Sequence, residues 1–268
     1  MKKDSQKEVT NMKHFGLLGE HLGHSLSPKL HADIMEQRGI DGDYTLVELP
    51  RDTVDQDFEA IKASKHYIGL NVTIPYKQTV IPHLDEIAPQ AEIIGAVNTI
   101  HFTDDGRAIG YNTDYYGVLA LMAENNIDIK GKTALILGAG GAARAFIAAI
   151  RDSGASRIYV ASRSAVAGDT YLDCPMISYD ALEHGFHADL VVNCTPVGMW
   201  PQVDASPLSK ETLEKLGASC ALDAIYNPDE TLFLKHAKDL GMTAANGMTM
   251  LWEQAVKAQD IWNGWKPE

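Results

Sequence analysis

Short apolar runs along the chain are separated by longer stretches with helical spacing, which predicts strands connected by helices. In the first part, strands are predicted at residues 15–19, 44–49, 67–73 and 97–102. Helices are predicted at 28–37 and 52–64, and a loop at 74–77 is expected to turn into a third helix. Ser27 is expected to cap the first helix, with Pro28 at its first position and Gly39 at its end. Strands that alternate with helices indicate βαβ units and a largely parallel sheet.

A second unit is predicted to begin near residues 112–114. Helical spacing at 115–125 is followed by a strand at 132–137, a helix at 142–152 and a strand at 158–161, which form a complete βαβ unit. Further strands of the parallel type are predicted at 190–194 and 220–225. The last stretch, 250–262, is amphipathic, with one apolar face made by Leu251, Ala255, Ala258 and Trp262.

Length and charge narrow the class of protein. A chain of 268 residues corresponds to about two domains, and an apolar content of 45% is enough to fill both cores. The net charge of −13 repels phosphate backbones and anionic lipid, so neither nucleic acid nor a membrane is expected as a partner. No apolar run approaches the ~18–20 residues of a membrane-spanning helix, and residues 1–13 form a polar extension unlike a secretory signal. We therefore expect a cytoplasmic protein.

Cysteine and histidine usage predicts no metal site. The chain has three cysteines, without a CxxC pair or a metal-binding Cys/His spacing, and this odd number fits a reducing compartment. Four histidines lie close together in the sequence but lack the spacing of a zinc site, namely His14, His21, His24 and His31.

A glycine motif follows the predicted strand at 132–137. Gly138, Gly140 and Ala143 match the G-x-G-x-x-G/A pattern of dinucleotide-binding loops, between a strand and a helix as that pattern requires. Gly138 permits the tight turn, Gly140 lets the backbone approach a diphosphate, and Ala143 permits close helix–strand packing. The alternative is a tight turn in a flavodoxin-like fold that binds no dinucleotide.

The end of the next predicted strand favours NADP over NAD. NAD sites usually place an acidic residue here to bind the ribose 2′-hydroxyl, whereas this chain has Ser162 and Arg163. A guanidinium can pair with the 2′-phosphate of NADP and stack on the adenine. The alternative is that Arg163 pairs with an acidic neighbour on the surface.

Polar residues recur where the predicted strands end, and parallel sheets build their sites there. Hydroxyl, amide and charged groups of this kind would suit a small polyhydroxylated ligand. The alternative for each is structural: Ser27 and Asp114 cap helices, Asn98 is a satisfied buried amide, and Lys77 is solvated. These polar positions are Ser25, Ser27, Asn71, Thr73, Lys77, Asn98, Thr99, Asn112, Thr113 and Asp114.

Taken in order, eight motifs between Phe15 and Trp262 resemble those of the shikimate dehydrogenase family. They are GHSLSP at 23–28, GLNVTIPYK at 69–77, GAVNT at 95–99, GYNTD at 110–114, the glycine loop at 138–141, NCTPVGM at 193–199, DAIYNP at 223–228 and NGMTML at 246–251 with Gln254. The resemblance implies a reversible, NADPH-dependent reduction of 3-dehydroshikimate to shikimate in aromatic amino acid biosynthesis. It also implies an α/β substrate-binding domain at 14–114 and 246–268, and a Rossmann-type doubly wound domain at 115–245.

The resemblance assigns roles residue by residue. Lys77 and Asp114 are the expected catalytic pair, in which Lys77 transfers the proton and Asp114 orients it. The expected substrate-binding residues are Ser25 and Ser27 for the carboxylate, and Asn71, Thr73, Asn98, Tyr226 and Gln254 for the rest. The expected cofactor-binding residues are Gly138, Ala139, Gly140, Gly141, Ala142, Ser162, Arg163, Thr195, Met199 and Gly247.

Departures from the family pattern keep two alternatives open. The second arginine usual after Arg163 is replaced by Ala167, and Asn246 replaces a frequent aspartate. The stretch up to Asp189 is short and contains Gly168 and Pro175, so a loop is expected there in place of a helix. A quinate/shikimate dehydrogenase that uses NAD or both cofactors is the nearest alternative. A non-catalytic metabolite sensor is the alternative from a different class, and a monomer or homodimer is expected in either case.

Overall fold

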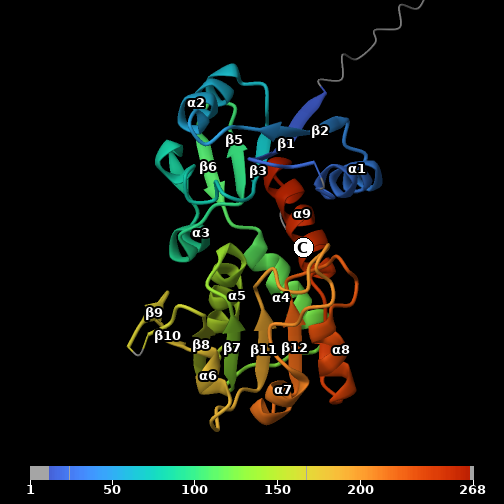
Figure 1. The fold of residues 1–268 in the computed structure, drawn as a ribbon. Helices are drawn as coiled ribbons and strands as arrows, with labels where there is room; N and C mark the ends of the chain where they lie inside the picture. The colour runs from blue at the N-terminus through green and yellow to red at the C-terminus, as the bar shows by residue number, and fades with distance from the viewer. Residues whose placement is uncertain (1–11, 24, 167, 266–268) are drawn as a thin grey trace, which may run out of the picture. The chain divides into compact units, whose positions relative to one another are not determined.

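A computed structural model describes residues 12–23, 25–166 and 168–265 (Figure 1). The chain divides into two compact units, each of which is described separately below. Unit 1 comprises residues 1–88, 97–111 and 258–268, and unit 2 comprises residues 89–96 and 112–257. Among the described residues, no helix combines the length and the apolarity that crossing a bilayer requires. Residues 1–11 of the predicted N-terminal extension lie outside the described part.

A six-stranded sheet forms the centre of unit 1, in the order β2-β1-β3-β5-β6-β4. The expected parallel arrangement holds for β2, β1 and β3, but β5 runs antiparallel to both β3 and β6. The antiparallel pairing of β5 with β6 is local, because a short turn in which Gly106 has a φ of +87° joins them into a hairpin. The antiparallel pairing of β5 with β3 is a contact between segments farther apart in the chain. The strands are β1 (Lys13–Gly19), β2 (Gly42–Glu48), β3 (Gly69–Val72), β4 (Glu86–Ile87), β5 (Thr99–Phe102) and β6 (Ala108–Tyr111).

The helices of unit 1 depart from prediction at two points. Helix α1 (Ser27–Arg38) ends at Gly39 as predicted, but Ser27 is its first residue and not its cap. The Ser25 hydroxyl instead accepts a hydrogen bond from the Ser27 N–H at 3.2 Å. Helix α2 (Val54–Ser64) is present, whereas the helix expected after residue 77 is only a 3₁₀ turn, η1 (Ile81–His83). The proline in that turn lacks the N–H that a continuing helix would need.

The end of the C-terminal helix α9 (Met248–Trp262) packs into the sheet of unit 1. Trp262 stacks on Phe15 with ring centroids 5.0 Å apart, and its indole N–H donates to the Ile100 carbonyl at 2.8 Å. A Cβ at Gly69 would overlap the Trp262 ring, so only glycine allows this close approach.

Unit 2 contains a seven-stranded sheet in the order β13-β12-β11-β7-β8-β10-β9, in which only β9 is antiparallel to its neighbour. Six strands of this sheet follow the Rossmann order, with β7 at the switch point. The strands are β7 (Thr133–Leu137), β8 (Arg157–Ala161), β9 (Thr170–Tyr171), β10 (Cys174–Ile177), β11 (Leu190–Asn193), β12 (Cys220–Asp223) and β13 (Thr243–Ala245).

Strand β7 is buried on both faces, as the predicted apolar run requires. Ala134 and Ile136 pack with the buried side chains of α4 and α5, whereas Leu135 and Leu137 pack with those of α7 and α8. The sheet is therefore doubly wound. These four helices are labelled in Figure 1. The helices of unit 2 are α3 (Pro89–Ile94), α4 (Asp114–Glu124), α5 (Gly141–Asp152), α6 (Tyr179–Leu182), α7 (Lys210–Leu216), α8 (Leu232–Asp239) and most of α9.

We expect the substitution Gly69→Ala to lower the free energy of unfolding by roughly 3 kcal/mol, the upper end of overpacking in a closed core. The added methyl group would occupy the space of the Trp262 indole. Urea unfolding at one pH measures this change. Gly23→Ala is the matched control because a Cβ at Gly23 would meet nothing within 4 Å. Equal unfolding midpoints for the two variants would contradict this packing.

Candidate functional site

A polar cluster in unit 1 lies where β1 and β3 end. The Thr73 N–H donates to the Leu18 carbonyl at 2.9 Å, which holds the chain after β3 against the end of β1. The following turn carries Lys77, whose carbonyl accepts from the Val97 N–H at 2.7 Å. The backbone therefore brings the segments of Thr73, Lys77 and Asn98 together, with Asn98 directly before the antiparallel strand β5.

The amide of Asn71 links three strands of this cluster. Its nitrogen donates to the Thr99 hydroxyl at 3.0 Å and to the Asn98 carbonyl at 3.3 Å, and its oxygen accepts from the Tyr44 hydroxyl at 2.7 Å. The Thr99 hydroxyl in turn donates to the Asn98 side-chain oxygen at 3.0 Å. Both amide hydrogens of Asn71 are thus used within the protein, so only its oxygen retains capacity, as an acceptor from a ligand hydroxyl.

Tyr44 is a residue of this cluster that the sequence analysis missed. Its ring stacks on the buried His31 imidazole, with centroids 4.0 Å apart and an interplanar angle of 8°. Burial raises the pKa of Tyr44 well above its usual range, and a hydrogen bond with the Ser27 side chain opposes this shift. Tyr44 therefore connects Asn71 with Ser27. The only sequence signal for it is its position in β2, the parallel neighbour of β1.

His31 supports Tyr44 from inside the unit. The Gln259 amide nitrogen, from the last turns of α9, lies 3.0 Å from the His31 Nδ1 atom. Burial lowers the pKa of His31 to about 3, so its imidazole is neutral at physiological pH.

In unit 2, Asp114 is the first residue of α4 and is buried. The preceding Thr113 hydroxyl donates to the Gln254 side-chain oxygen at 3.5 Å, and the Gln254 amide donates to the Leu251 carbonyl at 2.8 Å. Asn112 donates to the Ala96 carbonyl at 2.9 Å and fixes the start of the helix. The structure thus brings Gln254 next to the segment of Asp114. Lys77 belongs to unit 1, and its pairing with Asp114 stays a prediction.

The glycine loop between β7 and α5 is shaped to admit a dinucleotide. Gly138 has a φ of +93°, and a Cβ there would lie 2.8 Å from the Thr195 methyl group. A Cβ at Gly140 or Gly141 would meet nothing within 4 Å, and no side chain caps α5. The first N–H groups of α5 therefore lack intrahelical partners beside an open backbone surface, which suits an anion. Ala139 and Ala142 complete this loop.

The residues directly after β8 include Ser162 and Arg163, the pair predicted to bind a 2′-phosphate. Arg163 is exposed, and its charge acts on Tyr179, whose pKa is raised by burial and lowered by Arg163. The Ser162 and Ser164 hydroxyls are 3.2 Å apart. The stretch up to Asp189, predicted to be a loop in place of a helix, instead contains the small hairpin β9–β10 and the one-turn helix α6 among its described residues. Ala167 lies outside the described residues.

Thr195 is held by Asn193, which is held in turn by the buried carboxyl group of Asp223, a residue that the sequence analysis did not assign. The Asn193 oxygen accepts from the Thr195 N–H at 3.0 Å and from its hydroxyl at 2.7 Å. The Asn193 amide donates to Asp223 at 3.0 Å, and the Thr231 hydroxyl donates to Asp223 at 2.7 Å. Burial raises the pKa of Asp223 to about 6, although these hydrogen bonds oppose the shift. An aspartate that ends the apolar strand β12 is the signal that could have identified it.

The remaining predicted residues lie after β11, β12 and β13. Met199 is exposed, and burial raises the pKa of Tyr226. A Cβ at Gly247 would overlap the Ala224 carbonyl oxygen, so a glycine is required there by packing.

The strand order and the open glycine loop of unit 2 define the class, a two-unit α/β protein with a Rossmann-type dinucleotide-binding unit. The protein-family model described as the shikimate dehydrogenase substrate binding domain matches residues 17–100. A shikimate dehydrogenase (NADP(+)) of Clostridium perfringens is 42% identical over 258 residues, which are 95% of this chain and 94% of that protein. The chain belongs to the shikimate dehydrogenase family, as its motifs predict.

Solved structures agree over nearly the whole chain. A chorismate mutase/shikimate 5-dehydrogenase fusion protein from Clostridium acetobutylicum has a TM-score of 0.88 and 42% identity, and covers 96% of this chain and 93% of that one. The shikimate 5-dehydrogenase of Thermus thermophilus, in complex with NADP(H) and shikimate, has a TM-score of 0.84, 35% identity and coverages of 96% and 95%. A quinate dehydrogenase of Corynebacterium glutamicum, in complex with NAD, has a TM-score of 0.84, 29% identity and the same coverages.

We expect the carboxyl group of Asp223 to make the stability of this protein fall as the pH rises from about 4 to about 6. The folded state keeps its proton up to a pKa of about 6, whereas the unfolded chain loses it near 3.8. The folded form therefore binds more protons in this window, and its advantage, on the order of 2–3 kcal/mol, is lost as the pH rises. Asp223→Asn removes this titrating group, so the free energy of unfolding of the variant should fall less than that of wild type over this pH range.

Urea unfolding of wild type and Asp223→Asn at several pH values between 4 and 7 measures the effect. Asp239→Asn is the control because Asp239 is exposed, and its partner Lys210 lowers its pKa. The prediction is wrong if wild type and Asp223→Asn lose stability in parallel across this range.

Proposed function

We propose that this chain catalyses the reversible, NADP-dependent reduction of 3-dehydroshikimate to shikimate in aromatic amino acid biosynthesis. The observation that carries the proposal is the Asn71 cluster at the strand ends of unit 1, in a chain whose unit 2 has an open glycine loop followed by Arg163. The names of the relatives support the same reaction and cofactor. Residues 14–114 and 246–268 would form the substrate-binding domain, and residues 115–245 the NADP-binding domain.

The substrate carries a carboxylate and several hydroxyls, and unit 1 offers a group for each. Ser25 and Ser27 stand at the start of α1, where the helix dipole and their hydroxyls favour a carboxylate. The Asn71 oxygen accepts a substrate hydroxyl because its amide hydrogens are already used. Thr73 and Asn98 adjoin Asn71, and Tyr226 and Gln254 of unit 2 complete the proposed set.

NADPH supplies the hydride for the carbonyl carbon, and the protein positions the two reactants and moves one proton. The first N–H groups of α5 bind the diphosphate, and Arg163 with Ser162 binds the 2′-phosphate. Thr195, Met199 and Gly247 line the rest of the proposed dinucleotide site. In the reductive direction, the Lys77 ammonium donates its proton to the forming alkoxide oxygen, and Asp114 orients Lys77 and the reacting hydroxyl.

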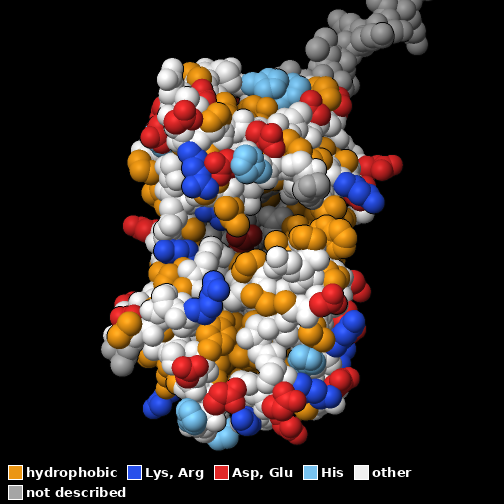
Figure 2. Space-filling view, viewed as in Figure 1, with side chains coloured by type: hydrophobic (Ala, Val, Ile, Leu, Met, Phe, Trp, Pro, Cys, Tyr) orange, Lys and Arg blue, Asp and Glu red, His pale blue; other side chains and the backbone are white. Residues whose placement is uncertain are grey.

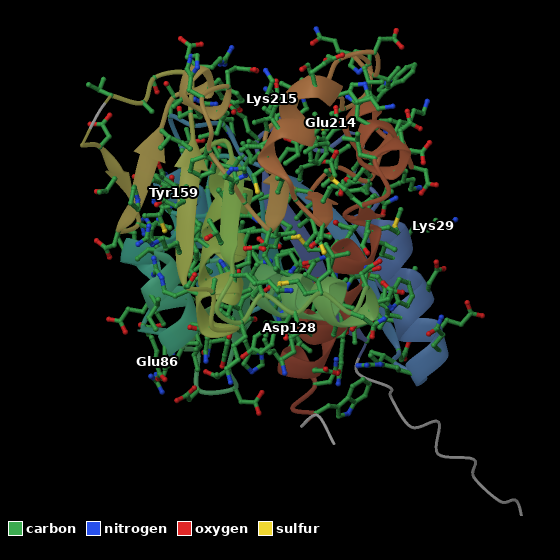
Figure 3. All side chains as sticks on the ribbon, turned by 90° about the horizontal axis from the view of Figure 1, so that it is seen from below. Lys29, Glu86, Asp128, Tyr159, Glu214 and Lys215 are labelled. Carbon is green, nitrogen blue, oxygen red and sulfur yellow. The ribbon has the colours of Figure 1, made fainter. Side chains whose placement is uncertain are left out.

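Removal of the Lys77 amine should lower kcat about 10²- to 10⁴-fold, with a much smaller change in substrate affinity. Steady-state oxidation of shikimate, followed by NADPH absorbance, compares Lys77→Ala with wild type. The control is Lys29→Ala, at an exposed lysine on α1 that is labelled in Figure 3. An unchanged kcat for Lys77→Ala would exclude it as the proton donor.

Loss of the Arg163 guanidinium should lower kcat/KM for NADP about 10- to 100-fold, the range of one charge-assisted contact, and lower kcat/KM for NAD much less, because NAD lacks the 2′-phosphate. Arg157→Ala serves as the control, since Arg157 is exposed at the opposite end of β8. An equal decrease in kcat/KM for NADP and for NAD would show that Arg163 does not bind the 2′-phosphate.

Assays with shikimate or quinate against NADP or NAD separate the alternatives. A quinate dehydrogenase in complex with NAD is among the similar structures, so NAD or quinate use is the second candidate. No turnover in any combination would favour a sensor.

The same proposal includes a cytoplasmic monomer or homodimer without nucleic-acid partners. Three unpaired thiols support the reducing compartment, and the charge of −13 disfavours nucleic acid.

A further inference from the structure

The hairpin that replaces a helix after β8 has an energetically costly turn. Strands β9 and β10 pair Tyr171 with Cys174, so Leu172 and Asp173 form the two-residue connection (Figure 1). Their φ angles of +50° and +62° are those of a type I′ turn, which normally selects glycine or asparagine. A leucine in this conformation costs roughly 1–2 kcal/mol.

Contacts with the core of unit 2 hold the hairpin in this conformation. The Arg151 guanidinium, from the end of α5, donates to the Leu172 carbonyl at 2.6 Å. Cys174 is buried, and Tyr171 and Leu172 pack against the same core as α4 and α5. Strained backbone that is held so firmly often has a role at a functional site.

The hairpin positions Tyr171 next to the glycine loop. Its hydroxyl donates to the Gly140 carbonyl at 3.2 Å. The Arg144 guanidinium lies over its ring, 5.5 Å from the centroid, and donates to the Ile94 carbonyl at 2.9 Å. Arg144 is the fourth residue of α5, and a cation near a helix N-terminus is unfavourable unless an anion balances it.

The Tyr171 hydrogen bond also affects the Gly141 N–H, because the Gly140 carbonyl and this N–H belong to the same peptide group. In a planar trans peptide the carbonyl and the N–H point in opposite directions. A hydroxyl that holds the Gly140 carbonyl on one side therefore aims the Gly141 N–H at the other. A Cβ at Gly141 would meet nothing within 4 Å, so the residue that carries this N–H has open space beside its Cα.

We propose that Tyr171 is a positioning residue that orients the Gly140–Gly141 peptide for the diphosphate of the dinucleotide. This inference rests on the proposed cofactor site and adds to it a residue from the hairpin. Because the diphosphate is common to NADP and NAD, Tyr171 acts on both cofactors equally. Arg163, in contrast, is the residue proposed to contact the 2′-phosphate, which NADP has and NAD lacks. Tyr171 thus contributes to the affinity for both dinucleotides, and Arg163 to the preference for NADP over NAD.

The test compares the dissociation constants of NADPH and NADH, by fluorescence titration, for wild type and Tyr171→Phe. Loss of one hydrogen bond to the loop should raise both constants about two- to tenfold and leave their ratio unchanged. Adenosine 2′-monophosphate has the 2′-phosphate but no diphosphate. Its inhibition constant in competition with NADPH should therefore be the same for wild type and Tyr171→Phe. The value of kcat at saturating cofactor should also be unchanged.

Tyr159→Phe is the matched control, because Tyr159, labelled in Figure 3, lies on β8, the strand that pairs with β10 of the hairpin. Its hydroxyl accepts from Arg157 at 3.5 Å. A Tm of Tyr171→Phe within about 2–4 °C of wild type shows an intact fold. Unchanged dinucleotide constants, or an equal weakening of adenosine 2′-monophosphate, would overturn the proposal. If wild type binds neither dinucleotide, both proposals fall. If it binds them without shikimate turnover, only the proposed reaction falls.

Discussion

The last turns of α9 dock onto the sheet of unit 1 at Gly69, and the polar cluster of that unit depends on this contact. Trp262 occupies the space that a side chain at position 69 would fill, and Gln259, one turn earlier, reaches His31. His31 stacks under Tyr44, which orients the Asn71 amide. A steric constraint at one glycine thus sets the position of hydrogen-bonding groups on three other elements.

The Asn71 cluster of unit 1 and the Asp223 cluster of unit 2 each contain buried polar groups that hydrogen-bond within the protein. The Asn71 amide hydrogens are both used, and the buried Asp223 accepts from Asn193, Thr231 and the Ile225 N–H. Such networks cost desolvation energy, which appears in the raised pKa of Asp223 and the lowered pKa of His31. In return they hold each side chain in one orientation, which is what recognition of a small polar ligand requires.

An acidic protein that binds anions must do so through local features. On the face shown in Figure 2, acidic and basic side chains are interspersed over each unit. The anion-binding groups proposed above are mostly backbone N–H groups and hydroxyls, at the starts of α1 and α5, with Arg163 as a single added charge. Directed dipoles at a helix start do not require a positive net charge.

The sequence by itself determined the strand and helix periods, the glycine loop, the family and the shortened region after β8, because these depend on neighbouring residues and on ordered motifs. It did not determine the direction of β5, the 3₁₀ turn at Ile81–His83, or the start of α1 at Ser27. It also missed Tyr44, Asp223 and the hairpin that carries Tyr171. Only the tertiary structure decides these, because a buried amide or carbonyl takes its partner from whatever the fold brings near. Asn71 and Tyr44 are 27 residues apart, and Tyr171 and Gly140 are 31 apart.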